Sequence, residues 1–363
     1  MTKKVLGFIV AVGFIAVTVI PGMTAEKRQW DRASLWNPGT VKMIKTKKYK
    51  KKPPYVIGFS NAGISNSWAV FMDREVRAEA ERHPKLIKKL YVTEANGKAE
   101  KQIGDIEDLL AKGIDILIVR AVTESALDPV ISRLHKRGFP VITVSKGIKS
   151  DNFISFVDAS NQVLGRINMV WLCEMLKGKG NIVMLGGWPG AGSVIDRKVG
   201  AEEALARYPG IKVLDYQYTH FSPTEGKKVM QAMIQSFGKK IDGVWCDSGL
   251  QGMGALEALV AAGMNVPITG DQLNGFMCKV LKHKFKACML SYPPRMGAEA
   301  VKLALRVLNG ESVPHHFNVP TLLSTTDDTA DVKADVPWSK LAQPAQPENW
   351  WIGHTLPKKW LPY

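Results

Sequence analysis

From residue 54 onward, short β-rich runs alternate regularly with segments of helical periodicity. A first series starts with the strand-like run YVIGFS (Tyr55–Ser60) and closes with NFISFVD (Asn152–Asp158). A second series starts with a helix expected over Gln162–Leu176 and reaches the run VPITG (Val266–Gly270). Strands that alternate with helices predict parallel sheets with crossover helices. Two such series favour two similar α/β lobes, with a ligand site where the carboxyl ends of the strands meet.

The N-terminus has the pattern of a secretory signal peptide. Lys3 and Lys4 precede sixteen largely apolar residues (Val5–Ile20), and a small-residue site ends at Ala25. Sixteen residues are short for a membrane span and typical of a signal peptide. We therefore expect residues 1–25 to be a signal peptide and the mature protein to be periplasmic; an uncleaved membrane anchor is the alternative.

The basic charge of the chain is concentrated near its N-terminus. The formal net charge is +16, of which residues 1–53 contribute +10 and the remaining 310 residues +6. This distribution does not predict a nucleic-acid-binding surface. We expect residues 26–53, including the lysine-rich stretch Lys42–Lys52, to form a solvated, disordered arm. The four cysteines lack CxxC spacing, which argues against a zinc site and leaves their disulfide state open.

The C-terminal segment, residues 326–363, is rich in proline and aperiodic, yet it contains four of the ten tryptophans. They are Trp338, Trp350, Trp351 and Trp360. A disordered tail usually lacks this much aromatic surface. We expect the segment to pack across a lobe, with an interaction surface as the alternative.

The glycine-rich run NIVMLGGWPGAGSVIDRKVG (Asn181–Gly200) resembles a phosphate-binding loop only in part. Gly187 and Gly192 have the P-loop spacing, but no lysine follows to neutralise a phosphate. A dinucleotide fingerprint would need a third glycine where Ile195 stands. We therefore predict no nucleotide cofactor. Arg197, early in the following helix, could instead offer its forked donors to hydroxyl or carboxylate oxygens.

Several stretches together identify a family resemblance. IGFSNAGISNSW, ISFVDASNQVLGR, GSVIDRKVGAEEALARYPGIKVL and PPRMGAEAVKLAL occur in the same order as in the ribose-binding-protein group, which the chain resembles over about Tyr55–Glu311. These are type I periplasmic solute-binding proteins of ABC sugar importers. The resemblance implies two Rossmann-like α/β lobes with parallel sheets, joined by a hinge that the chain crosses three times. The expected lobes are residues 54–158 with 292–313, and residues 159–291 with 314–325.

The resemblance also implies a set of ligand-contacting residues in the cleft between the lobes. The matching positions are Asn66, Trp68, Thr123, Ser125, Lys146, Arg197, Phe221, Asp247, Ser248, Asp271 and Ser291. Core packing is the alternative for Phe221, and a helix cap is the alternative for Asp271. Trp188 could also line the cleft, whereas Trp245 lies mid-strand and is expected in the core.

The implied function is that of an exported, monomeric, non-catalytic receptor. It would capture a sugar or related solute and deliver it to a membrane permease with a cytoplasmic ATPase. The alternatives are a partner of a membrane sensor, or a sugar-modifying enzyme that uses Asp247 and Asp271 as paired carboxylates. No metal site is expected, because His315 and His316 would point to opposite faces of a strand.

The ligand is expected to differ from a plain aldopentose. Thr123, Ser248 and Ser291 replace longer amide or acidic side chains of ribose-type relatives, while Arg197 and Lys146 or Arg120 keep positive charge. A bulkier or acidic sugar derivative would use the extra room and the positive charge. A neutral sugar is the alternative, since Asp247 and Asp271 could offset the cations.

Overall fold

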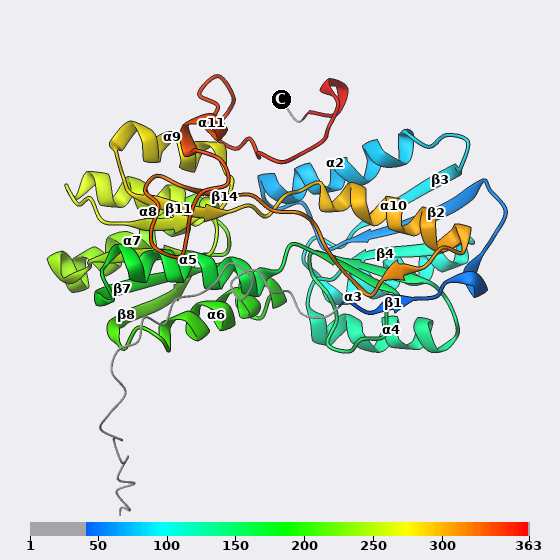
Figure 1. The fold of residues 1–363 in the computed structure, drawn as a ribbon. Coiled ribbons are helices and arrows are strands. Elements are labelled where there is room, and N and C mark those ends of the chain that lie inside the picture. The colour runs from blue at the N-terminus through cyan, green and yellow to red at the C-terminus, as the bar shows by residue number, and fades with distance from the viewer. Residues whose placement is uncertain (1–40, 362–363) are drawn as a thin grey trace, which may run out of the picture.

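The computed structural model describes residues 41–361, which form two α/β lobes side by side (Figure 1). The expected signal peptide and residues 26–40 lie outside the described residues. Within residues 41–361 no helix has both the length and the apolar character needed to cross a membrane. The four cysteines are free thiols, and all but Cys278 are buried.

The first lobe has a six-stranded parallel sheet in the order β13-β6-β5-β4-β2-β3. Its strands are β2 (Tyr55–Asn61), β3 (Ile87–Glu94), β4 (Ile116–Arg120), β5 (Val141–Val144), β6 (Ser155–Asp158) and β13 (His316–Asn318). Its helices are α2 (Ser67–Glu81), α3 (Ala99–Ala111), α4 (Glu124–Lys136) and α10 (Met296–Asn309). Helices α2 and α10 cover one face and α3 and α4 the other (Figure 1). Because helices cover both faces, central strands such as β4 are buried along their whole length.

The second lobe repeats this plan with the order β14-β11-β10-β9-β7-β8, in which β14 alone is antiparallel to its neighbour. Its strands are β7 (Lys179–Gly186), β8 (Gly210–Tyr218), β9 (Gly243–Cys246), β10 (Ile268–Gly270), β11 (Ala287–Leu290) and β14 (Leu323–Thr325). Its helices are α5 (Asn161–Met175), α6 (Gly192–Leu205), α7 (Pro223–Phe237), α8 (Gly249–Ala261) and α9 (Asn274–His283). The predicted two-lobed α/β fold is confirmed.

Within residues 41–325 the chain passes between the lobes three times, and the third passage falls later than the sequence suggests; the C-terminal segment then spans the lobes once more. The resemblance predicts that residues 314–325 belong to the second lobe, but β13 pairs with β6 in the first lobe and only β14 joins the second sheet. The crossings are bonded to one another: Ser291 N donates to Leu322 O (2.9 Å), Leu322 N donates to Ser291 Oγ (2.7 Å), and Val319 N donates to Asp158 O (2.7 Å). Three short, mutually bonded segments form a hinge.

The lysine-rich stretch before the first lobe is ordered, contrary to expectation. β1 (Met43–Ile44) pairs with β12 (Val313–Pro314), and a short 3-10 turn follows at Lys47–Tyr49. Thr46 and the ring of Tyr49 are buried against the lobe. The lysines alternate with residues that pack inward, so the charged heads stay in solvent while the backbone is fixed.

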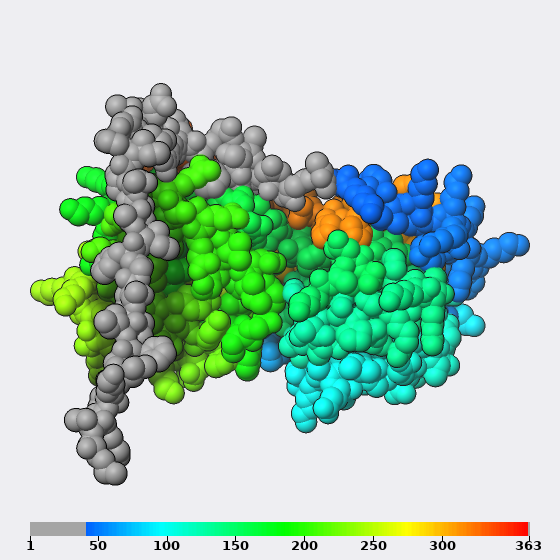
Figure 2. Space-filling view, turned by 90° about the horizontal axis from the view of Figure 1, so that it is seen from below, coloured from blue at the N-terminus to red at the C-terminus, as the bar shows by residue number. Residues whose placement is uncertain are grey.

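The C-terminal segment contacts both lobes instead of one. It contains the short helix α11 (Trp338–Leu341) beside α9, and it ends in a 3-10 turn at Lys358–Trp360 near α2. Figure 1 shows it, in orange to red, passing along one side of the molecule from α11 to α2. On the face seen in Figure 2 the two lobes meet along a narrow seam.

Candidate functional site

The cavity between the lobes lies at the carboxyl ends of both parallel sheets, where the topology predicts a ligand site. Its cavity volume is about 40 Å³, which is room for about three water molecules. The inner cavity is lined by Asn66, Trp68, Arg120, Ser145, Lys146, Ser193, Arg197, Phe221, Ser248, Leu250, Asp271, Tyr292 and Trp351. Seven of these are sequence-predicted site residues: Asn66, Trp68, Lys146, Arg197, Phe221, Ser248 and Asp271.

Arg197 is held rigidly at the centre of the cavity wall. Its helix, α6, packs closely on α5 at Gly165. Only glycine allows this approach, since a Cβ at that position would lie 1.8 Å from the carbonyl oxygen of Arg197. The Nε atom donates to Asn161 Oδ1 (2.8 Å), and Nη1 donates to the backbone oxygen of Asp247 (2.7 Å). The side chain is buried and lines the cavity, so its remaining N–H donors can bind a ligand there.

Two further cations come from the first lobe. Arg120, at the end of β4, donates from Nη1 to Gly63 O (2.9 Å) and lies over the ring of Trp68 (5.4 Å). Lys146 follows β5, and burial together with the nearby Arg120 charge lowers its pKa to about 7. Arg120 Nε is buried without a hydrogen-bond partner among the described residues. A buried N–H without a protein partner usually donates its hydrogen bond to a ligand or an ordered water.

Asp271 is the one acidic side chain among the described residues that line the inner cavity. Its Oδ1 accepts from Gly249 N (2.6 Å) and from Ser248 Oγ (3.2 Å), and its Oδ2 lies 4.0 Å from Arg197 Nη1. Burial raises the pKa of Asp271 to about 6, against the opposing effect of Arg197. The alternative prediction, that Asp271 caps a helix, is also supported in part. The carboxylate accepts from the backbone N–H of Gly249, the first residue of α8, and not from α9, the helix that follows it in the chain.

Aromatic rings supply the apolar surface. The ring of Phe221 packs against the backbone of Gly187. A Cβ on residue 187 would lie only 2.2 Å from the ring atom Cζ, so glycine at position 187 allows the ring to reach the cavity. Trp68 donates from Nε1 to Tyr292 O (2.8 Å), and their ring centroids are 5.3 Å apart. Tyr292 in turn lies 4.6 Å from the guanidinium of Arg197.

The cavity opens into a wider outer region that includes Thr123 and Trp188 and shares Asn66, Arg120, Lys146 and Phe221 with the inner part. Trp188 is 45 % exposed there. The first turn of α6 touches the first turn of α4 across the cleft, since a Cβ on Gly192 would lie 1.9 Å from Glu124 Oε1. The lobes are therefore closed over the inner cavity.

Three predicted residues do not line the cavity. Ser125 is exposed on the first turn of α4. Ser291 is occupied by the hinge, where its Oγ accepts from Leu322 N. Asp247 is fully buried behind the wall: its carboxylate accepts from Gly187 N (3.1 Å) and from the Gln251 amide, and burial raises its pKa to about 7. Trp245 is buried in the core, as expected.

Several lining residues escaped the sequence argument: Ser145, Ser193, Leu250, Tyr292 and Trp351. Tyr292 directly follows the predicted hinge position Ser291, which is a signal that could have identified it. Trp351 carried no such signal, because only the folded tail brings it to the cavity.

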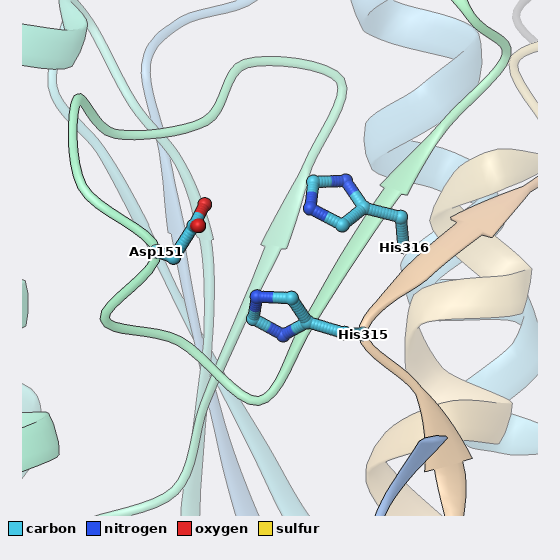
Figure 3. Close-up of side chains that lie close together, drawn as sticks. All are labelled: Asp151, His315 and His316. Atoms are coloured by element: carbon cyan, nitrogen blue, oxygen red, sulfur yellow. The ribbon is translucent and has the colours of Figure 1, made fainter. Parts of the chain in front are cut away.

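The paired histidines behave differently from the prediction (Figure 3). His315 falls between β12 and β13, so the two rings do not alternate across a strand; their centroids are 4.9 Å apart. With Asp151 they form a group whose potential metal-ligating atoms lie within 4.8 Å of one another. His315 Nδ1 faces Ile154 O (3.2 Å), while Asp151 and His316 are exposed. None of the three lines the interlobe cavity.

Comparison with known proteins agrees with this architecture. Residues 57–312 match the family model described as periplasmic binding protein domain. The chain is 34% identical over 177 residues to a xylitol-binding protein of Mycolicibacterium smegmatis, covering 48% of this chain and about half (51%) of that relative. It is 24% identical over 324 residues to the ribose import binding protein RbsB of Bacillus subtilis, covering 89% of this chain and 99% of the relative.

The fold has close solved counterparts. The crystal structure of a galactofuranose binding protein superposes with a TM-score of 0.68 at 25% identity, covering 74% of this chain and 94% of that one. The family model spans well over half of the chain and includes both lobes up to the end of α10. The chain therefore belongs to the periplasmic binding protein family, as a type I member of the group that contains the ribose-binding proteins.

Proposed function

We propose that this protein is a periplasmic receptor that captures a sugar or sugar-like solute between its lobes and delivers it to an ABC-transporter permease. The observation that carries the proposal is the closed interlobe cavity, to which both lobes contribute fixed hydrogen-bonding groups and aromatic rings. Sugars combine hydroxyls in fixed directions with apolar C–H faces, so charged donors and aromatic surfaces suit them together. Hinge closure sequesters the solute and creates the surface that a permease can recognise.

The enzyme alternative loses its carboxylate pair. A glycosidase needs two carboxylates facing one bound sugar. Asp271 lines the cavity, but the carboxylate of Asp247 is turned toward Gly187 N and Gln251 behind the wall. The pair on which that alternative depended is therefore split between the cavity and the interior of the second lobe.

The charge of the cavity favours an acidic solute. Among residues 41–361, the cations Arg120, Lys146 and Arg197 line the inner cavity with one carboxylate, that of Asp271. The pKa of Lys146 is lowered because its ammonium is buried beside the Arg120 charge, with no offsetting carboxylate among the causes. A carboxylate or phosphate group on the solute would supply a counter-charge and restore the protonated amine.

Two measurements test the function and the ligand class. Native mass spectrometry of protein purified without refolding is expected to show a retained solute, whose mass identifies its chemical class. In a thermal-shift panel, xylonate should stabilise the protein more than xylitol, because the two differ in one carboxylate. Lys146→Gln should reduce this preference, whereas the exposed neighbour Lys149 changed to Gln should not. Stabilisation by ribose or xylitol with no response to any sugar acid would reject the acidic-ligand proposal.

A further inference from the structure

One wall of the cavity comes from outside the family domain. The family model ends at residue 312, whereas Trp351 stands in the C-terminal segment and lines the inner cavity beside Asp271, Trp68 and Tyr292. Trp351 is 1% exposed, so its ring is enclosed by the closed lobes. The family domain therefore does not account for this part of the site.

Trp351 is fixed from the second lobe through its backbone. It forms an isolated antiparallel bridge with Leu273, and the next residue, Ile352, donates its N–H to Gln272 O (3.3 Å). Asn274 N donates to Trp350 O (2.9 Å) on the other side. Because residues 272–274 directly follow Asp271, the tryptophan is positioned by the same loop that carries the cavity's carboxylate.

The side chain of Trp351 is fixed from the first lobe. Its Nε1 donates to Ser67 Oγ (2.8 Å), and Ser67 stands between Asn66 and Trp68, both of which line the cavity. Further along the segment, Thr355 Oγ1 donates to Glu75 Oε2 (2.7 Å), and Arg74 donates to Trp360 O (3.0 Å), both on α2. The ring thus has one orientation, set by groups that themselves belong to the site.

We propose that Trp351 is a ligand-contacting, specificity-determining residue, which the C-terminal segment adds to the common two-lobed site. Its indole face would cover an apolar face of the bound sugar, as aromatic rings do. Because its backbone is bonded to one lobe and its side chain to the other, the wall is complete only when the lobes are closed. This inference rests on the proposed sugar-binding function.

The test compares Trp351→Leu with the matched variant Trp338→Leu in the full chain. Trp338 belongs to the same segment and is equally buried, but it packs against Phe276, donates to Met277 O (3.1 Å) and does not line the cavity. Calorimetric titration with ribose, xylitol and xylonate gives both absolute affinities and their ratios. We expect Trp351→Leu to weaken the best of these ligands by about tenfold and to change the ratios. Trp338→Leu should lower the melting temperature with unchanged ratios.

The possible outcomes separate this inference from the proposed function. Wild-type affinities in Trp351→Leu, or an equal loss with unchanged ratios in both variants, would overturn the role of Trp351 while leaving the receptor function intact. If Trp351→Leu does not fold, Trp351→Phe retains a ring without the Nε1 donor and should show a smaller change in the same ratios; unchanged ratios there would likewise overturn it. A wild-type protein that binds no member of the panel and retains no solute would overturn both.

Discussion

Replacing Arg197 by alanine should nearly abolish binding while leaving the lobes folded. Arg197 is 2% exposed, its guanidinium is held by Asn161 Oδ1 and the Asp247 carbonyl, and it lines the closed cavity. Truncating one partner of a buried, hydrogen-bonded charge typically costs about 2–5 kcal/mol of binding free energy. At about 1.4 kcal/mol per tenfold, this corresponds to a loss of about 30-fold to about 4,000-fold in affinity.

The same substitution should also lower the free energy of unfolding, by a comparable amount. Asn161 Oδ1 and the Asp247 carbonyl each lose a buried donor, at about 1–3 kcal/mol for each group left unpaired. Arg197 also lowers the pKa of Asp271 and of Asp247, so both carboxyls should bind protons more tightly in the variant. Proton uptake limits the cost, because a neutral acid needs no counter-charge.

Calorimetry with the solute identified by native mass spectrometry measures the affinity, and thermal unfolding measures the stability. The control is Arg166→Ala, because Arg166 on α5 is similarly buried but pairs with Glu203 (2.7 Å) outside the cavity. Wild-type affinity in Arg197→Ala would remove this residue from the site. An equal loss in Arg166→Ala would show that the effect comes from general destabilisation.

Three further outcomes are expected. Saturating ligand should reduce the radius of gyration in solution scattering, because the hinge closes over the solute; an unchanged radius would contradict the clamp. In the closed form, Asp247 (pKa about 7) and Asp271 (pKa about 6) should contribute less to the free energy of unfolding as pH rises from 5 to 7, because the folded protein binds protons there which the unfolded chain has released. The lowered pKa values of His135, His316 and His354 act in the opposite direction. Asp271→Asn should make the dependence of the free energy of unfolding on pH less steep. Lys146 is protonated in both the folded and the unfolded state well below pH 7, so it should not change the sign of this dependence. Gly187→Ala should weaken binding by displacing Phe221 from the cavity, since the added Cβ would clash with its ring; an unchanged affinity would remove Phe221 from the contacts.

Local pattern was sufficient for the two lobes and for Arg197 as a candidate, whereas the family resemblance supplied the other predicted site residues. Strands buried on both faces read as continuous apolar runs, and the helices between them keep their own period, so the order of elements follows from neighbouring residues. Asn66 and Asp271 lie at the ends of such elements and Arg197 lies in the second turn of α6, and parallel strands bring these ends together. The pattern and the resemblance together therefore predicted this part of the cavity.

The tertiary structure decided which of the end-of-strand residues face the cavity and what completes it. Asp247 and Asp271 follow neighbouring strands, yet one carboxylate turns behind the wall because Gly187 N and Gln251 hold it there. β13 joins the first lobe, and Trp351 reaches the cavity about 280 residues after its partner Ser67, through contacts between segments far apart in the chain. Periodicity describes interactions between near neighbours only, so the orientation of a side chain and the docking of an aperiodic tail depend on packing that forms when the whole chain has folded.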